Sequence, residues 1–216
     1  RLVYTVYQHA AVNSQSDDIR KALIDLYNST DGDRWTWNDN WCSDLPLSEW
    51  YGITTNKEAG ISDDDGVARI ALSNNNLTGT IPSSIGLLSG VWTGISLSSN
   101  HISGTLPKEA FRLETLDLGN NEIDAIEAPD DPSGIMAIHI YLDNNRISGP
   151  LPEYLGYAPV LRDLRLENNC FTGQIPSSYS RLIASNVELY LNGNELSGRI
   201  PDDILDELGF SAVWPQ

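Results

Sequence analysis

Tyrosine, arginine and charged residues, which can bind ligands or catalyse reactions, recur at a regular spacing in the second half of the chain. Tyr141, Arg165 and Tyr190 stand 24 and 25 positions apart, and each has a charged residue two positions away. Tyrosine and arginine are the residue types most enriched at binding hot spots, whereas carboxylates and histidine are the groups that acid–base catalysis uses. The pattern is therefore compatible with a binding patch or with an active site.

A binding patch is the interpretation that we favour. We expect Tyr141, Arg165 and Tyr190 to form its centre, because large aromatic and guanidinium groups recur there with a fixed period. The side chains expected to ring this centre are His139, Asp143, Arg162, Asp163, Glu167 and Glu188. The alternative is a solvated surface on which Asp163 and Arg165 each pair with charged neighbours on adjacent strands, which adds little stability.

An active site is the less favoured interpretation. His139 and Asp163 occupy equivalent positions, and a His–Asp pair is half of a nucleophilic triad. However, the nearest serines lie in other repeats or at the edges, no GxSxG elbow is present, and an open surface excludes water poorly. Carboxylates are weak evidence for glycoside hydrolysis in a chain with 30 Asp and Glu residues. We therefore expect no catalytic residue.

Metal and cofactor sites are not indicated either. The two cysteines form no CxxC pair, and the three histidines form no HExxH or HxH pair, so we expect neither a zinc site nor a cofactor. The acidic segments 63–65 and 122–134 raise calcium as an alternative. Both lack the alternating ligands of an EF-hand, and polar loops are the simpler explanation.

Composition narrows the class of protein and of partner. A chain of 216 residues with 40% apolar and 20% charged residues is an ordinary globular chain. Its net charge of −17 argues against nucleic acid and anionic membranes as partners, since both attract clustered Lys and Arg. No apolar run approaches the roughly 18 residues of a membrane span, so we expect no membrane insertion. The chain begins with Arg1 rather than Met, and we expect a mature or excised fragment.

An internal repeat places the candidate residues. Four segments, beginning at 67, 92, 161 and 186, share the frame LxxLxLxxNxLxGxIP, and weaker copies begin at 113 and 137. The asparagines of the frame are Asn75, Asn100, Asn121, Asn145, Asn169 and Asn194, at intervals of 21 to 25 residues. A period near 24 residues predicts units that stack on one another.

The frame also predicts the structure of each unit. An alternating apolar pair such as Ile70 and Leu72 indicates a short strand with one buried face. Because so short a strand cannot bury that face alone, the copies should stack as parallel strands about 4.8 Å apart. The frame asparagines then turn inward as a ladder that hydrogen-bonds the backbone, and Gly-x-Ile-Pro bends the chain. Strand positions between the leucines face one surface, which brings Tyr141, Arg165 and Tyr190 together.

These residues resemble the plant-type leucine-rich repeat. The resemblance covers residues 67–201, and the Trp-rich block 33–53 looks like the N-terminal cap of such domains. It implies an α/β solenoid, a curved right-handed stack of about six repeats with a parallel concave sheet. Ser48 stands where a cysteine often precedes the x-Trp-x-Gly stretch, so the usual cap disulfide is not implied. The same solenoid serves receptor ectodomains, polygalacturonase inhibitors and secreted algal, protist and bacterial proteins, so function must be argued from the site.

The chain divides into four predicted parts. They are an N-terminal arm (1–15), a helical and Trp-rich cap (16–66), six repeats (67–201) and a C-terminal cap (202–216). Residues 16–28 predict an amphipathic helix with Ser16 as its N-cap. The tryptophans at 35, 37, 41 and 50 either form a carbohydrate platform or, as we prefer, cover the apolar end of the stack.

Short patterns bear on the compartment. Asn28 and Asn76 fit the N-glycosylation acceptor pattern. Cys42 precedes the first repeat strand, and Cys170 lies about four strand spacings, or about 19 Å, beyond that strand. That separation is too long for a disulfide, so we expect both thiols to be buried or free. We expect a secreted glycoprotein in an extracellular or cell-surface location.

The function that we expect is non-catalytic extracellular recognition of a protein, peptide or glycan through the concave face. The alternative is a structural or adhesive subunit of an extracellular assembly, motivated by the arm 1–12 and the absent initial Met. An ice-binding surface is disfavoured because no regular row of threonines runs down the coils.

Overall fold

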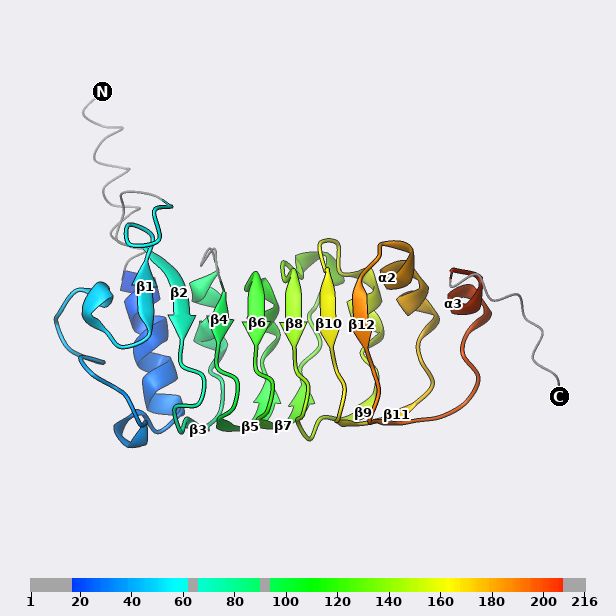
Figure 1. The fold of residues 1–216 in the computed structure, drawn as a ribbon, viewed down its shortest axis with the longest axis horizontal. Helices are drawn as coiled ribbons and strands as arrows, with labels where there is room; N and C mark the ends of the chain where they lie inside the picture. Colours follow the sequence, from blue (N-terminus) through cyan, green and yellow to red (C-terminus); the bar gives the residue numbers. More distant parts are fainter. Residues whose placement is uncertain (1–16, 62–65, 90–93, 208–216) are drawn as a thin grey trace, which may run out of the picture.

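The computed structural model describes residues 17–61, 66–89 and 94–207. It is an elongated stack of coils, one for each repeat, running from the N-terminal helix to α3 (Figure 1). The predicted arm, the predicted N-cap Ser16, the acidic segment 63–65 and the end of the predicted C-terminal cap lie outside the described residues.

A seven-stranded principal sheet runs the length of the stack in the order β1-β2-β4-β6-β8-β10-β12. Its strands are β1 (Ile53–Thr55), β2 (Val67–Ala71), β4 (Ile95–Ser96), β6 (Thr115–Asp117), β8 (His139–Tyr141), β10 (Asp163–Arg165) and β12 (Glu188–Tyr190). The predicted parallel stack with one strand per repeat is confirmed. The cap adds β1, which pairs antiparallel with β2 and was not predicted. We call the exposed side of this sheet, which was predicted to be concave, the sheet face.

Two smaller sheets lie along another side of the stack. Their strands are β3 (Thr78–Gly79), β5 (His101–Leu106) and β7 (Glu122–Ile126) in one, and β9 (Ser148–Pro150), β11 (Cys170–Gly173) and β13 (Glu195–Leu196) in the other. The sequence predicted only a bend around Gly-x-Ile-Pro, and a loop over 122–134. Both expectations were incomplete, because stacking lays the backbone segments after each ladder asparagine side by side, where they pair.

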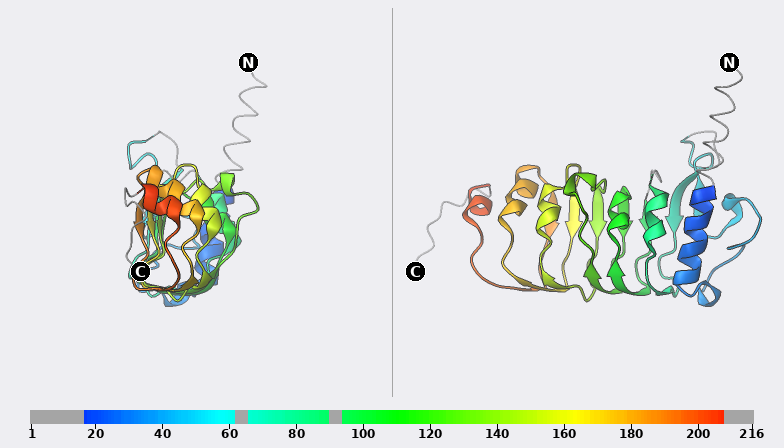
Figure 2. Two further views of the ribbon diagram at one scale, coloured as in Figure 1. Left: turned by 90° about the vertical axis from the view of Figure 1, so that its right-hand side faces the viewer. Right: turned by 180° about the vertical axis from the view of Figure 1, so that it is seen from behind.

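Short helical segments cover the side of the stack away from the sheet, except for the first two, which belong to the cap (Figure 2). In chain order the segments are η1 (Gly32–Arg34), η2 (Leu47–Glu49), η3 (Ser83–Leu88), η4 (Lys108–Arg112), η5 (Pro132–Gly134), η6 (Glu153–Tyr157), η7 (Ser177–Tyr179), α2 (Ser180–Ala184) and α3 (Asp202–Glu207). The frame proline stands immediately before η3, η4, η6 and η7. Its ring sets the backbone for entry into a helix and needs no N–H there, which explains its place in the frame.

The apolar residues of the frame fill one continuous core between these sides. Ile70, Leu72, Leu164 and Leu166 each have 0% of their surface exposed. Burying a side chain of this size contributes about 1.5–3 kcal/mol relative to leaving it in water. The core is therefore shared between neighbouring coils, as the shortness of the strands required.

Asparagine side chains join each coil to the coil before it. The amide of Asn100 donates to the Leu72 carbonyl, and its oxygen accepts the N–H groups of Asn75 and Leu77, at 2.9 to 3.0 Å. In the later coils Asn121, Asn145, Asn169 and Asn194 donate to the carbonyls of Leu97, Leu118, Leu142 and Leu166. Since the first five asparagines are buried, each amide satisfies backbone groups that stacking removes from water.

The residue before each ladder asparagine makes the turn. Asn74, Ser99, Asn120, Asn144 and Asn168 have positive φ angles between 52° and 58°. Each donates its backbone N–H to a carbonyl of the following coil. Asparagine tolerates this left-handed conformation better than most residues, which explains the recurrent Asn-Asn pair in the repeats.

The cap closes the first coil. A helix over residues 17–29 buries Leu23 and Leu26 against the stack, as its apolar face predicted. Trp35, Trp41 and Trp50 are buried and pack ring against ring at centroid distances of 4.8 to 5.2 Å. These three tryptophans therefore cover the end of the stack rather than form a platform.

The fourth tryptophan of the cap behaves differently. Trp37 is 43% exposed and stacks on Tyr51 at 5.8 Å. Its backbone N–H and carbonyl bind the side chain of Asn75 at 2.7 and 2.9 Å. The cap is thereby joined to the asparagine ladder by the same bonds that join the coils.

Cys42 and Cys170 are free thiols and both are exposed. The predicted absence of a bridge between them agrees with the structure, whereas burial, one of the two predicted states, is wrong. In the part of the chain that the structure describes, no helix combines the length and apolar composition needed to cross a bilayer.

Replacing Asn100 by alanine tests the ladder. We expect Asn100→Ala to lower the free energy of unfolding by about 2–4 kcal/mol, because it leaves buried N–H and carbonyl groups of two coils without partners. Chemical denaturation measures this loss. The exposed Asn192 serves as a control, and Asn192→Ala should stay within about 0.5 kcal/mol of the parent. Equal losses in the two variants would contradict a ladder that stabilises the stack.

Two buried tyrosines predict a loss of stability at alkaline pH. Burial raises the pKa of Tyr154 and of Tyr179 above that of free tyrosine. A raised pKa means that the stabilising effect is complete below the unfolded-state pKa of about 10 and disappears as the pH rises above it. We expect urea unfolding to show a steep fall in stability above about pH 10. Tyr154→Phe should reduce this fall, and an unchanged alkaline slope in this variant would contradict the assignment.

Candidate functional site

One register position of the principal sheet carries a continuous row of polar and aromatic side chains. Strand pairing sets Ser96, Asp117, Tyr141, Arg165 and Tyr190 opposite one another on β4, β6, β8, β10 and β12. Side chains at one register position of neighbouring strands start about 4.8 Å apart and point to the same side. The structure therefore brings the three predicted central residues together on the sheet face.

Arg165 is enclosed by its neighbours in this row. Its guanidinium carbon lies 4.7 Å from the Tyr141 ring centroid and 5.1 Å from the Tyr190 ring centroid. Both distances are within the range of favourable cation–π contact. The same guanidinium donates to Asp163 at 3.1 and 3.4 Å. We call these four residues the Tyr–Arg–Tyr stack.

Charge in the stack is balanced within one strand. The side chain of Asp163 is 9% exposed and that of Arg165 is 41% exposed, so the carboxylate is the buried member of the pair. The alternative of lateral pairing with adjacent strands is therefore wrong, since the two charges pair with each other along β10. Burial, followed by the nearby Asp163 carboxylate, raises the pKa of Tyr141, and the Glu188 carboxylate raises the pKa of Tyr190.

The other predicted residues surround the stack with separate roles. His139 lies opposite Asp163 in the register, but the Asp163 carboxylate binds Arg165, and His139 Nδ1 has no partner among the described residues. Asp143 accepts a bond from Asn144 at 2.7 Å. One buried carboxylate oxygen of Glu167 likewise has no partner in the described part of the chain. Glu188 accepts a bond from Tyr190 at 3.3 Å, and Arg162 is exposed just before β10.

A hydroxyl network on the sheet face was not predicted. Ser96 and Ser98 both donate to Asp117 Oδ2, at 2.6 and 3.0 Å. Ser73 lies within hydrogen-bonding distance of both serine hydroxyls, at 2.7 and 3.0 Å. A serine by itself is a weak signal in a sequence, so these hydroxyls were not among the predicted binding residues. Their shared register with Asp117 was the available signal.

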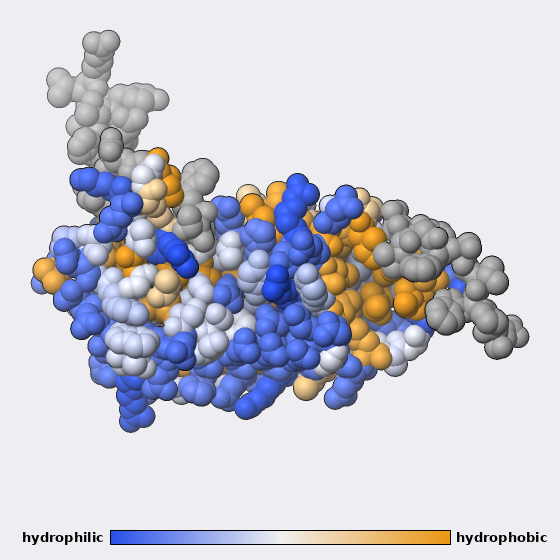
Figure 3. Space-filling model, viewed as in Figure 1, coloured by the Kyte–Doolittle hydropathy of each residue, from blue (hydrophilic) through white to orange (hydrophobic). Residues whose placement is uncertain are grey.

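A hollow of about 460 Å³ opens on the sheet face beside Tyr141. Its lining residues are Thr54, Ala59, Arg69, Gly94, Ile95, Ser96, Thr115, Asp117 and Tyr141. Figure 3 shows that this face is mostly hydrophilic over its central strands and becomes apolar beyond β12. We call this space the Asp117 hollow.

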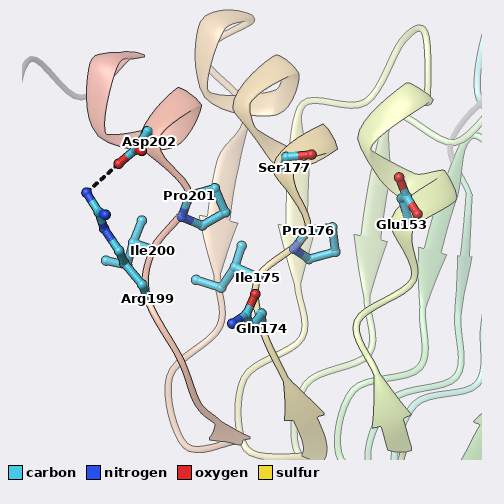
Figure 4. Close-up of a pocket in the computed structure, with 9 residues that line it drawn as sticks. All are labelled: Glu153, Gln174, Ile175, Pro176, Ser177, Arg199, Ile200, Pro201 and Asp202. Carbon is cyan, nitrogen blue, oxygen red and sulfur yellow. Dashed lines mark hydrogen bonds and ion pairs between the residues drawn. The ribbon is translucent and has the colours of Figure 1, made fainter.

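A second hollow lies at the C-terminal end of the stack. It measures about 480 Å³ and lies between two consecutive coils (Figure 4). Ile175 and Pro176 line it from one coil and Ile200 and Pro201 from the next, while Arg199 pairs with Asp202 at 2.6 Å. None of the predicted binding residues lines this space.

The predicted glycosylation sites and the acidic segment 122–134 lie apart from the sheet face. Asn28 and Asn76 are exposed, and the Asn76 amide donates to the Arg34 carbonyl at 2.9 Å. In the acidic segment 122–134, Glu122 pairs with Arg146 at 3.2 Å and Asp130 with Lys108 at 2.6 Å. Within the described ranges no group of three or more His, Cys, Asp or Glu side chains is arranged to hold a metal ion.

Comparison with known proteins identifies the repeats. The family model described as Leucine Rich Repeat matches residues 68–88, 138–158, 160–182 and 187–206. Pollen receptor-like kinase 2 of Arabidopsis thaliana is 31% identical over 168 residues, which are 76% of this chain and 24% of that protein. The chain spans between 6% and 24% of the length of the curated relatives that it matches.

Solved structures agree with this comparison. The Arabidopsis receptor kinase HAESA, solved in complex with the peptide hormone IDA and the co-receptor SERK1, covers 92% of this chain and is itself covered to 32%. Its TM-score is 0.69 at 22% identity, so this likeness concerns the fold. The plant peptide hormone receptor RGFR1, in complex with RGF2, has a TM-score of 0.56 at 30% identity over 63% of this chain and 22% of that one.

The buried carboxylate of the stack predicts a stability effect. Arg165→Met should lower the free energy of unfolding by about 1–3 kcal/mol, because it leaves Asp163 buried without its partner. Adding Asp163→Asn should recover part of that loss, since the variant pair buries no charge. Arg162→Met, which removes an exposed arginine next to the same strand, is the control and should have little effect. Thermal or urea unfolding measures all four proteins. A loss no larger than that of the control would contradict the pairing.

Proposed function

The chain contains a leucine-rich-repeat domain of the plant type, and from that premise we propose that it recognises a peptide or protein through its sheet face. The observation that carries the proposal is the Tyr–Arg–Tyr stack. It places two tyrosines and an arginine, the residue types typical of hot spots, side by side on an exposed surface. The likeness to a plant peptide hormone receptor at 30% identity supports a peptide as the ligand.

The internal contacts of the stack suit recognition. Asp163 and the two rings hold Arg165 in one position before any ligand arrives, so little side-chain freedom is lost on binding. Tyr190 is 39% exposed and presents its ring to solvent. A ligand strand lying across β8, β10 and β12 would meet a rigid apolar and polar surface of this kind.

We propose no reaction at this surface. Asp163, the carboxylate that a His–Asp catalytic pair needs, is bound to Arg165, and His139 makes no hydrogen bond to it in the described part of the chain. The open face also leaves water in contact with any bound group. The proposed role is therefore recognition without catalysis.

The proposed location is extracellular or on the cell surface. The curated relatives are named as receptor-like proteins and receptor-like kinases, which supports this location. Asn28 and Asn76 are exposed, so a glycan could attach to either asparagine without unfolding the chain.

A structural or adhesive role in an extracellular assembly is the second candidate. The favouring observation is the apolar surface that Figure 3 shows beyond β12. Near this end of the stack Leu189 of β12 and Leu191 are only partly buried, and Ile200 is 44% exposed. Such an end surface suits end-to-end contact between copies. Light scattering at rising concentration separates the candidates, because a strict monomer contradicts the assembly.

A triple substitution tests the proposed site. We expect Tyr141→Ala with Arg165→Ala and Tyr190→Ala to weaken binding of selected peptides or proteins at least tenfold, because it removes the hot-spot side chains. Surface plasmon resonance against ligands selected on the parent chain measures the change. A glycan array run in parallel tests the carbohydrate alternative.

The control removes a similar contact from the opposite side of the stack. Arg181 lies 4.8 Å over the Tyr157 ring, among the helical segments. The Tyr157→Ala and Arg181→Ala double variant should keep the parent affinity. Equal binding by the triple variant, once its folding has been verified by circular dichroism, would show that the ligand binds elsewhere.

A further inference from the structure

Arg165 shows how this surface holds a cation. Its guanidinium lies against the Tyr141 ring at 4.7 Å and is paired with a carboxylate, Asp163, at 3.1 Å. A tyrosine face and a carboxylate are the two groups that stabilise a positive charge at a partly desolvated surface. The protein therefore contains one occupied cation position, and Tyr141 forms one of its walls.

The other side of Tyr141 offers the same two groups without a cation. Register places Asp117 on β6 opposite Tyr141, so the Tyr141 ring stands between the Asp117 and Arg165 side chains. Asp117 and Tyr141 both line the Asp117 hollow. Among the described residues Asp117 takes part in no ion pair.

The Asp117 carboxylate is held in place on one side only. Ser96 and Ser98 direct their hydroxyls to Oδ2, at 2.6 and 3.0 Å. Oδ1 accepts a single long bond of 3.3 Å from the Gly119 N–H. A carboxylate with one oxygen anchored and the other nearly free is preorganised to accept a charged donor.

The hollow is large enough to hold an extended side chain. Its volume of about 460 Å³ exceeds that of one long side chain and leaves room for part of the attached backbone. Gly94 and Ser96 line it beside Asp117, and Thr54 of β1 and Ala59 also line it. Arg69 also lines the hollow and forms no ion pair in the described part of the chain. Its charge favours a ligand carbonyl or carboxylate at that edge, so a ligand cation is directed to the Tyr141 end.

We propose that the Asp117 hollow is a subsite for a lysine or arginine side chain of the ligand. This inference rests on the proposed function for the identity of the ligand as a peptide or protein, but the cation site itself is independent of it. The net charge of −17 attracts basic ligands over a distance, and the hollow is the specific site at which a basic side chain would bind. A neutral sugar, with hydroxyls for Asp117 and a ring face for Tyr141, is the competing occupant.

Titration of the labelled chain with small probes tests the subsite directly. Nα-acetylarginine amide is the cationic probe, and Nα-acetylcitrulline amide is its neutral control of nearly the same shape. We expect weak, millimolar binding of the arginine probe, with amide shifts centred on Gly94, Ile95 and Thr115, and at least fivefold weaker binding of the citrulline probe.

Variants assign the charge to one residue. Asp117→Asn should weaken binding of the arginine probe at least fivefold, and Tyr141→Leu should weaken that binding as well. Asp124→Asn makes the same change in net charge on β7, away from the sheet face, and should leave the probe unaffected. Equal binding of the two probes, equal effects of Asp117→Asn and Asp124→Asn, or stronger shifts of these amides by methyl galactoside would overturn the subsite.

Selection from a random peptide library separates this inference from the proposed function. The parent chain should enrich peptides that contain Lys or Arg, and Asp117→Asn should lose that preference. If the selected peptides show no preference for Lys or Arg and bind the parent and Asp117→Asn with equal affinity, the subsite is wrong and the proposed function stands. If the arginine probe binds at the hollow but no peptide or protein binds the sheet face, the subsite stands and the proposed function fails.

Discussion

A buried amide that must be hydrogen-bonded is the constraint on which the rest of this solenoid depends. Stacked coils remove backbone groups from water at the turn after each strand, and a strand of two to five residues cannot satisfy them. The side chain of Asn100 reaches a carbonyl and two N–H groups of the preceding coil. Each later ladder asparagine likewise reaches one carbonyl and one N–H of the coil before it. These bonds set the rotation of each coil relative to its neighbour, and through it the register of the principal sheet.

The same constraint explains how the stack begins. Asn75 has no repeat before it, and its side chain binds the backbone of Trp37 instead. The cap therefore supplies by its main chain what an earlier repeat would supply, while Trp35, Trp41 and Trp50 supply the missing apolar cover. The first coil needs hydrogen-bond partners for Asn75 and an apolar cover for its open end, and the Trp-rich segment of the cap supplies both. The need for a bulky apolar cover explains why tryptophans are concentrated there.

Register in turn organises the chemistry of the sheet face. Because equivalent positions line up, Asp117, Tyr141, Arg165 and Tyr190 alternate as carboxylate, ring, guanidinium and ring. Arg165 pairs with Asp163 along β10, while Asp117 lines a hollow and takes part in no ion pair among the described residues. The carboxylates of this acidic chain therefore differ in their environment, since some are paired with cations within the fold and others face solvent.

The sequence by itself determined the repeat, the parallel strands, the buried leucines and the set of residues that share the sheet face, because all of these follow from periodicity along the chain. Only the tertiary structure decided which neighbour each charged group contacts. Asp163 had His139 and Arg165 within reach, and it pairs with Arg165, whose guanidinium also lies between two tyrosine rings. The smaller sheets, the antiparallel β1 and the hollow at Asp117 were likewise decided by stacking, since each depends on segments that meet only when neighbouring coils are in place.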